Sequence, residues 1–458
     1  MKNKIVISIL FFTMLLTLSG CGCKSNNAGQ AAIELEIWGP IDDSFTYKDV
    51  FEAYQKLYPN VKDIRYRRFS PDTYEKELVD ALASGQGPDI FLIHNTWLPS
   101  FKDKIIPAPA EIINEQRFRS NFVDVVVADF LDQGKVWASP LSVDSLGLYY
   151  NKDLFNEAGI STPPKNWDEF GKDARLLTKF STSHEIIQSG AAFGAAYNIN
   201  RSTDVLNLLM MQSGTQTNDK GVLDLRTSKV TGGSNYSPAE DALSFYTQFA
   251  QATSPYYSWN SRMHYSIDAF SEGTLAMMFN YSWHIQTIKD KSPKLNFAVA
   301  SVPQFAGSSP MNFANYWGFA VAKNKQTAEG VTNETRISES WKLINFLTTK
   351  PEGQFAAANG GMLGSGAIDS NYDPAKEYLE KTRKPAARRD LIETQKTDAE
   401  LGVFAKDNLI AKSWKEVQPD AIESILAEMI DQVNKGQANV TDAIETASQR
   451  IGKLSSEE

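Results

Sequence analysis

The 458-residue sequence is poor in cysteine, histidine and positive charge. Its two cysteines, Cys21 and Cys23, lie near the N-terminus, so no disulfide can cross-link the rest of the chain. With 46 basic against 55 acidic residues, the formal net charge is −9, which disfavours a nucleic-acid partner. The four histidines lack the spacing of a metal site, and we expect neither a metal nor a cofactor: they are His94, His184, His264 and His284.

Complete catalytic motifs are also missing. The Gly-Lys pairs that begin at Gly134, Gly171 and Gly452 are not followed by Ser or Thr, so none matches a nucleotide-binding P-loop. His184-Glu185 begins a zinc-protease motif, but Gln188 stands where the second histidine would be. We therefore expect no catalytic residue. A glycoside hydrolase stays open at this point, because its paired carboxylates need no fixed spacing.

The longest apolar run lies at the N-terminus and predicts export. Lys2 and Lys4 precede the apolar stretch 5–18, which is shorter than the roughly 20 residues that span a bilayer. This pattern is typical of a signal peptide, which we place at residues 1–20. The segment Leu18-Ser19-Gly20-Cys21 resembles a bacterial lipobox, so we expect Cys21 to carry a lipid. Residues 21–32 are small and polar, which predicts a flexible tether.

The mature chain alternates between strand and helix patterns. Its length predicts two domains, since single cores stop growing near about 250–300 residues. The continuous apolar run Ile90-Phe91-Leu92-Ile93 predicts a strand buried on both faces, as in a parallel sheet. Asn166 and Ser237 are expected helix caps. Other expected strands are 33–37, 61–69, 146–150, 274–279, 295–302 and 316–322, and expected helices include 50–58, 71–82, 421–433 and 443–454. This order predicts an α/β fold.

Several motifs along the chain resemble one family. They are Gly87–Phe91 followed by Asn95-Thr96-Trp97, Gly134–Pro140, Tyr149–Phe155, Glu157–Ile160 followed by Trp167–Phe170, and Phe270–Met278. In this order they resemble the extracellular solute-binding proteins of family 1, which serve ABC importers, commonly for sugars. The stretch from Tyr149 to Phe170 is the most specific part of the resemblance. Maltose-binding proteins typify this family.

The resemblance implies two α/β lobes, with a ligand cleft between them and three chain crossings at the hinge. We expect the crossings near 142–146, 313–318 and 411–418. Lobe one would comprise residues 33–143 and 317–411, and lobe two residues 144–316 and 412–455. Each lobe would therefore be discontinuous in sequence.

Aromatic residues are plentiful, with nine Trp and seventeen Tyr, and several follow predicted strands. An aromatic face can cover the C–H side of a sugar ring while polar groups bind its hydroxyls. With the implied layout, we expect Trp259, Trp283 and Trp317 to stack on the ligand and Asp144 to accept hydrogen bonds from hydroxyls. Further expected ligand-binding residues are Trp38, Asn95, Trp97, Asn280 and Trp414.

The resemblance implies a non-enzymatic, monomeric receptor outside the cytoplasm, attached to a membrane through its lipid anchor only. It would capture a sugar or oligosaccharide and deliver it to the permease subunits of an ABC importer. Three alternatives stay open. The fold could bind another solute, namely a polyamine, a glycerol phosphate or a metal complex; the chain could be an exported glycoside hydrolase; or it could serve adhesion or sensing.

Overall fold

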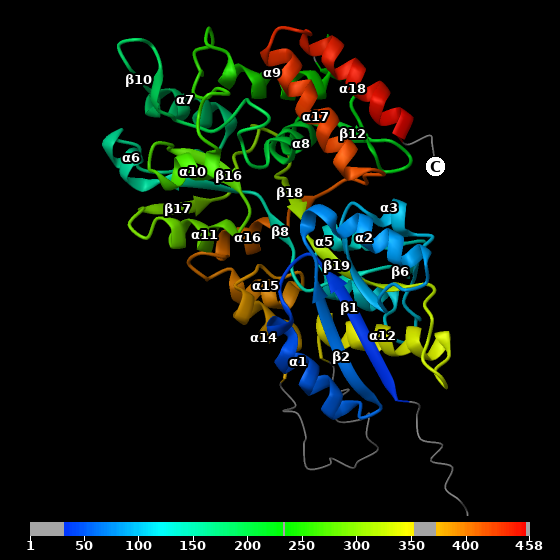
Figure 1. Cartoon of the computed structure of the whole chain (residues 1–458). Coiled ribbons are helices and arrows are strands. Elements are labelled where there is room, and N and C mark those ends of the chain that lie inside the picture. The colour runs from blue at the N-terminus through cyan, green and yellow to red at the C-terminus, as the bar shows by residue number, and fades with distance from the viewer. Residues whose placement is uncertain (1–31, 232–233, 352–371, 455–458) are drawn as a thin grey trace, which may run out of the picture.

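The computed structural model describes residues 32–231, 234–351 and 372–454. The predicted signal peptide, Cys21, Cys23 and the tether up to residue 31 lie outside these ranges. Two α/β lobes are stacked one above the other, as Figure 1 shows. The expected fold class is therefore confirmed.

One lobe is built on a mixed sheet with the strand order β2-β1-β3-β19-β4, in which β7 also pairs with β19. Strand β1 is parallel to both neighbours, whereas β19 returns antiparallel to β3 from much later in the chain. The alternating and continuous apolar patterns predicted β1 and β3 correctly, and β3 is buried along its apolar run. The elements around this sheet are β1 (Ile33–Gly39), α1 (Ser44–Leu57), β2 (Val61–Arg68), α2 (Pro71–Ala83), β3 (Ile90–His94), α3 (Leu98–Phe101), β4 (Ile105–Ile106), α4 (Glu115–Asn121), α5 (Asp124–Phe130), β5 (Leu131–Asp132), β6 (Lys135–Val136), β7 (Ser139–Pro140), β19 (Trp317–Ala322), α12 (Asn333–Thr348) and α14 (Pro374–Thr382).

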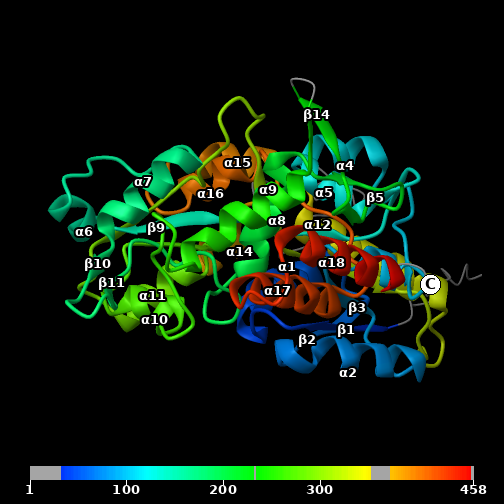
Figure 2. The same ribbon diagram turned by 90° about the horizontal axis from the view of Figure 1, so that it is seen from above.

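The other lobe has a smaller antiparallel sheet, β16-β9-β17, and more helix. Two of its helices, α17 and α18, pack along each other (Figure 2). Its elements are β9 (Gly147–Asn151), α6 (Lys152–Glu157), α7 (Trp167–Leu177), β10 (Lys179–Phe180), β11 (Ile186–Gln188), α8 (Ser202–Ser213), β12 (Gln216–Thr217), β13 (Leu223–Asp224), β14 (Lys229–Thr231), β15 (Ser234–Tyr236), α9 (Pro238–Thr247), a 3₁₀ turn (Gln248–Ala250), α10 (Ser266–Ser271), β16 (Met277–Asn280), α11 (His284–Lys291), β17 (Phe297–Ala300), α17 (Pro419–Asn434) and α18 (Val440–Leu454). The strands expected at 274–279 and 295–302 are shorter than predicted.

Helix caps in this lobe form as the sequence predicts. The side chain of Asn166 accepts a hydrogen bond from the backbone N–H of Glu169, whose carboxylate accepts one from the backbone N–H of Lys165. The hydroxyl of Ser237 caps α9 at the N–H of Glu240. Such caps satisfy N–H groups that a helix start leaves free, so each fixes where its helix begins.

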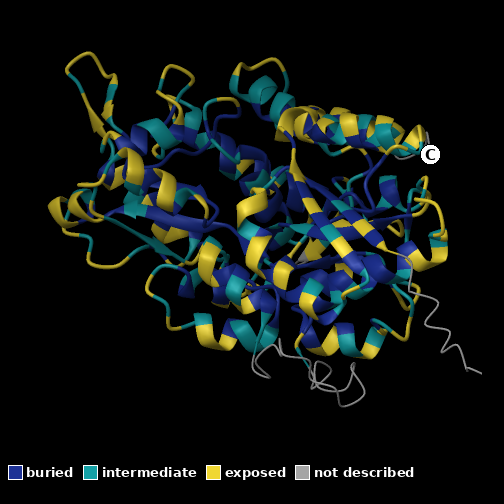
Figure 3. Ribbon diagram, turned by 60° about the horizontal axis from the view of Figure 1, so that its bottom comes forward, coloured by how far each residue is buried: buried dark blue, intermediate teal, exposed yellow. Residues whose placement is uncertain are grey.

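The apolar core is divided between the lobes. One buried cluster draws on residues 33–143 and 314–411, and a second on residues 146–313 and 414–451. A third, smaller cluster in the second lobe contains Tyr149 and Phe404. Phe404 belongs to the segment expected in lobe one, but α16 (Gly402–Asp407) places it against the other lobe. Figure 3 shows the central strands buried and the outer faces of the helices exposed.

Three short strands join the lobes in one small sheet. Strand β18 (Asn312–Asn315) pairs in parallel with β20 (Ala411–Lys412) and antiparallel with β8 (Asp144–Ser145). These strands lie in or beside the three expected crossings, so segments far apart in sequence run side by side at the hinge. Each lobe is therefore tied to the other through neighbouring backbone.

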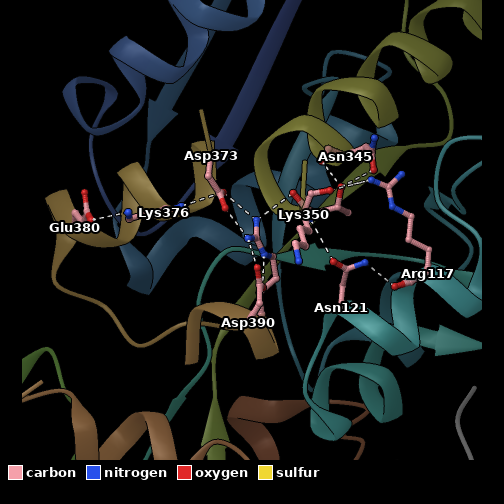
Figure 4. Close-up of polar contacts among 10 residues, drawn as sticks. Arg117, Asn121, Asn345, Lys350, Asp373, Lys376, Glu380 and Asp390 are labelled. Atoms are coloured by element: carbon pink, nitrogen blue, oxygen red, sulfur yellow. Dashed lines mark hydrogen bonds and ion pairs between the residues drawn. The ribbon is translucent and has the colours of Figure 1, made fainter. Parts of the chain in front are cut away.

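A buried guanidinium fastens α12, α14 and α15 (Arg389–Gln395) to one another. Arg388 is 1% exposed and donates two hydrogen bonds to Asp373 (2.5 and 2.9 Å) and two to Asp390 (2.9 and 3.0 Å). It also donates to the backbone oxygen of Thr349 at 3.1 Å. Figure 4 shows Asp373 and Asp390 converging from α14 and α15 beside Lys350. Bidentate pairing of this kind needs the planar fork of arginine.

Replacing Arg388 should destabilise the protein strongly. We expect Arg388→Ala to lower the free energy of unfolding by about 3–5 kcal/mol, because it leaves two carboxylates facing a buried site without a partner. Arg388→Lys should recover only part of the loss. Arg65→Ala is the matched control, since Arg65 pairs with Glu34 in solvent and should change stability by less than about 1 kcal/mol. Chemical denaturation measures all three, and equal effects of the two alanine variants would contradict the role of Arg388.

Candidate ligand-binding cleft

A cavity of about 890 Å³ lies where the lobes and the crossings meet. Its walls come from the end of β3 and the loop after it, the first turns of α8, the loop before α11, the crossings and the start of α17. This volume is within the range of about 300–1,000 Å³ that is usual for small-molecule sites. The cavity is thus the candidate functional site of the described residues.

Trp97 and Trp317 form a rigid aromatic pair on the first lobe. Their rings meet edge to face, with centroids 5.1 Å apart. Trp97 also stacks on Phe101 at 5.2 Å, and the His94 ring lies 5.2 Å from Trp317. Burial lowers the pKa of His94 to about 4, with Arg201 adding to the effect, so this imidazole is neutral at physiological pH. This part of the cavity wall is therefore aromatic and uncharged.

Trp283 lines the cavity from the second lobe and is the most accessible of its aromatic residues, at 37% exposed. Its ring stacks on Tyr281 with centroids 4.7 Å apart and an interplanar angle of 23°. The guanidinium of Arg201 lies 5.6 Å from the centroids of both rings. The hydroxyl of Tyr281 donates to Asp204 at 2.8 Å. One face of Trp283 is thus supported by protein while part of the ring meets solvent.

Asp144 also lines the cavity, but protein donors already occupy its carboxylate. It accepts hydrogen bonds from the backbone N–H of Ser145 at 2.9 Å and of Ser282 at 2.9 Å, and from the Ser282 hydroxyl at 2.5 Å. Burial raises the pKa of Asp144 to about 7, despite the lowering effect of these hydrogen bonds. Through its hydrogen bonds with Ser282, Asp144 links the first crossing to the loop that carries Trp283.

Trp259 does not reach the cavity. It is fully buried in the third apolar cluster, and its indole N–H donates to Asn198 at 3.1 Å. An indole with no accessible face cannot stack on a ligand. Trp414 is likewise buried in the second cluster. We correct the expectation for both residues: each lies in a segment without helix or strand, but its ring is buried in an apolar cluster.

Trp38, Asn95 and Asn280 are also absent from the cavity walls. Trp38 packs on Phe69 with centroids 4.5 Å apart, and its N–H donates to Glu36 at 2.8 Å. Asn95 donates to Asp129, and Asn280 accepts from the backbone N–H of the next residue. Both amides are buried and help to hold their own loops. All three lie outside this cavity, and their expected roles in ligand binding stay predictions. A position at the end of a strand does not fix the direction of the side chain.

Several polar residues of the cavity were not predicted from sequence. Thr203, Asp204 and Asn207 lie in the first turns of α8, and Glu416 and Glu423 lie just before and within the start of α17. A signal was present, because Asp204 and Asn207 are spaced by one turn on a helix that is otherwise mostly apolar. Arg201 precedes this helix with a φ of +63°, a conformation that is unusual for a residue with a side chain.

Buried carboxylates hold the crossings together. Asp129 accepts hydrogen bonds from the hydroxyls of Tyr316 (2.6 Å) and Ser413 and from the amide of Asn95. It thus connects α5 to the second and third crossings. Burial raises the pKa of Asp129 to about 6. No basic side chain forms an ion pair with it in the described part of the chain.

Asp407, at the end of α16, is another buried carboxylate that accepts hydrogen bonds from distant segments. It accepts hydrogen bonds from the hydroxyl of Ser301 at 2.9 Å and from the amide of Asn312 at 3.0 Å. The same amide donates to the backbone oxygen of Leu146 at 2.7 Å. Burial raises the pKa of Asp407 to about 6. With Asp144, three carboxylates of elevated pKa therefore lie at the hinge.

Sequence and structure comparisons define the class of protein. Residues 39–354 match the family of bacterial extracellular solute-binding proteins, and the chain belongs to this family. It is 22% identical to the diacetylchitobiose-binding protein DasA of Streptomyces coelicolor over 389 residues, which cover 81% of this chain and 84% of the relative. It is also 22% identical to the maltotriose-binding protein of Pyrococcus abyssi over 308 residues, covering 67% and 60%.

Solved structures support the fold. The sugar-binding protein MalE of the phytopathogen Xanthomonas citri superposes with a TM-score of 0.68 at 18% identity, covering 93% of this chain and 98% of the other. These relatives are binding proteins rather than enzymes. Among the described residues, no helix combines the length and the apolar character needed to cross a bilayer. The same residues contain no group of three or more His, Cys, Asp or Glu side chains placed to hold a metal ion.

The hinge carboxylates predict a defined pH dependence of stability. Their folded pKa values lie above the unfolded value of about 3.9, so the folded state binds more protons between about pH 4 and pH 7. Their contribution to the free energy of unfolding should therefore rise as the pH falls from 8 to 5. Asp129→Asn, which cannot titrate, should show a rise smaller by about 1–3 kcal/mol. Denaturation at a series of pH values tests this, and identical pH profiles for both proteins would refute it.

Proposed function

We propose that this protein captures a sugar or oligosaccharide in the cleft, closes its lobes on it and delivers it to the permease subunits of an ABC importer. The observation that carries the proposal is that Trp283 of one lobe and the Trp97–Trp317 pair of the other line a single cavity together with polar side chains. Aromatic faces and hydrogen-bonding groups are the two features that a saccharide requires. The relatives that bind maltotriose and diacetylchitobiose support this ligand class.

The proposed bodies that move are residues 33–143 with 317–411 and residues 144–316 with 412–455. The separate apolar clusters support two rigid units, and the small sheet β20-β18-β8 supports a hinge between them. Ligand that contacts both lobes stabilises the closed form, because it binds that form better than the open one. We propose that the protein acts as a monomer and binds without turnover, so that bound oligosaccharides are recovered intact.

We also propose that the mature protein is exported and held at a membrane by a lipid on Cys21. The lipobox-like sequence supports this proposal. Removal of residues 1–20 would leave Cys21 as the first residue.

Removing the accessible indoles should weaken saccharide binding. We expect Trp283→Ala and Trp317→Ala each to reduce the binding free energy by about 1–3 kcal/mol, because each loses an aromatic surface on which a sugar ring stacks. Trp283→Phe should retain part of the affinity. Calorimetry against a panel of oligosaccharides measures the effect.

Trp137→Ala is the matched control for these variants. Trp137 is half-buried in the first lobe and does not line the cavity, so its removal should leave affinity unchanged. Wild-type affinity in both cleft variants would contradict the proposed site. Release of shorter sugars during the titration would instead favour a glycoside hydrolase.

The anchor is tested by Cys21→Ala. We expect the wild-type chain, expressed in a bacterial host and labelled with a radioactive fatty acid, to carry label and to partition into detergent with membranes. The Cys21→Ala variant should carry none, whereas Cys23→Ala should be labelled like the wild type. Equal labelling of the Cys21→Ala variant would show that the lipid is attached elsewhere.

A further inference from the structure

Four carboxylates converge on the second-lobe side of the cleft. Asp204 comes from α8, Glu416 from the segment after the third crossing, and Asp420 and Glu423 from the start of α17. We call these four residues the carboxylate wall. They are close enough to interact: burial raises the pKa of Glu416 well above its usual range, and repulsion by Asp204, Glu423 and Asp420 raises it further. The wall thus brings together carboxyl groups from separate elements, and their charged forms repel one another in the free protein.

Few positive groups offset the carboxylate wall. Burial raises the pKa of both Asp204 and Glu423, and Arg201 is the cation that opposes this rise. In the described part of the chain, Glu416, Asp420 and Glu423 form no ion pair, whereas Asp42 across the cavity is paired with Lys384 at 2.6 Å. Arg201 is therefore the cation that faces the four carboxyl groups from the second lobe, whereas Arg68 and Lys384 line the cavity from the first lobe.

Helix stability explains only part of the carboxylate wall. Asp420 lies in the first turn of α17, where a negative charge interacts favourably with the helix dipole. Asp204 likewise lies in the first turn of α8, whereas Glu416 precedes α17 and lies outside its first turn. Bringing these groups together costs electrostatic energy in the free protein. A positively charged ligand would recover that energy on binding.

Asn207 provides an independent indication of the ligand's chemistry. It lies one turn beyond Asp204 on α8, lines the cavity and is only 3% exposed. Its amide oxygen has no hydrogen-bond partner within the described structure. A buried acceptor left unpaired is costly, and a hydrogen-bond donor on a bound ligand would supply the missing partner. This amide oxygen and the carboxyl groups of the wall lie beside the same cavity.

We propose that the ligand carries a protonated primary amine, and that within the saccharide function proposed above it is an amino sugar whose ammonium group binds the carboxylate wall. An ammonium has three N–H donors and no acceptor, which matches a wall of carboxylates and an unpaired amide oxygen. The sugar rings lie against Trp283 and the Trp97–Trp317 pair. This inference rests on the proposed function and specifies its substrate class.

The test compares three trisaccharides of equal length by calorimetry: the trimer of glucosamine, the trimer of N-acetylglucosamine and a trimer of glucose. Neighbouring oxygens make the amines of glucosamine less basic than simple aliphatic amines, so the test is run at about pH 6 to keep them largely protonated. We then expect the glucosamine trimer to bind at least about ten-fold more tightly than the acetylated one. The preference should shrink as salt is added, because screening weakens charge interactions. Spermidine forms a fourth arm, with ammonium groups but no sugar ring.

Two single-residue variants test whether the preference for the glucosamine trimer arises at the carboxylate wall. Glu423→Gln should weaken binding of the glucosamine trimer about three- to ten-fold and leave binding of the neutral trimers unchanged. Asp431→Asn is the matched control, because it makes the same change of charge on α17 at a residue that pairs with Lys435 outside the cavity. Both sites are at the surface of the helix, so both variants should fold.

The outcomes separate this inference from the function on which it rests. Equal or tighter binding of the acetylated or glucose trimer would overturn amine recognition and leave saccharide binding in place. Binding of spermidine without any saccharide would retain the ammonium site and overturn the saccharide function. An equal loss of affinity for the glucosamine trimer in Glu423→Gln and Asp431→Asn would show that the preference depends on net charge alone. That result would overturn the carboxylate wall as the binding site.

Discussion

The whole structure depends on how three chain crossings are held between two lobes without a disulfide. Buried carboxylates hold them, because Asp129, Asp144 and Asp407 each accept hydrogen bonds from segments far away in sequence. Their partners are hydroxyls, amides and backbone N–H groups rather than basic side chains. Hydroxyls can turn about their C–O bonds, so such links would tolerate the small rotations that the proposed closure requires. An ion pair with fixed geometry would resist such movement more strongly.

The hydrogen bonds of Asp144 explain why the sequence indicated its position but not its contacts within the protein. The sequence resemblance put it at a crossing and at the cleft, and it lies at both. Its oxygens, however, face Ser145 and Ser282, and sequence spacing does not indicate the second of these because Ser282 is distant along the chain. Long-range partners of this kind become visible only when the chain is folded.

The features that could be predicted from the sequence are those set by neighbouring residues. Strand β3 and the caps at Asn166 and Ser237 follow from local apolar patterns and from the free N–H groups of helix starts. Side-chain direction is different. Trp259 and Trp283 both lie outside the helices and strands, yet one is enclosed in the core and the other meets solvent. The distinction depends on packing against distant segments, which no local pattern records.

The carboxylate wall is assembled from residues that are distant in sequence, so local patterns do not reveal it. Its charges also affect the free energy of closing the cleft. Asp204 and Glu423 belong to helices that pack together in the second lobe, so their mutual repulsion is present whether the cleft is open or closed. Closing the cleft excludes water and strengthens every charge interaction inside it. Empty closure then raises the cost of the unpaired charges, whereas closure on a cation lowers it. Under the proposed function, a cleft with this wall would couple closing to the charge of its ligand, which a neutral aromatic cleft would not do.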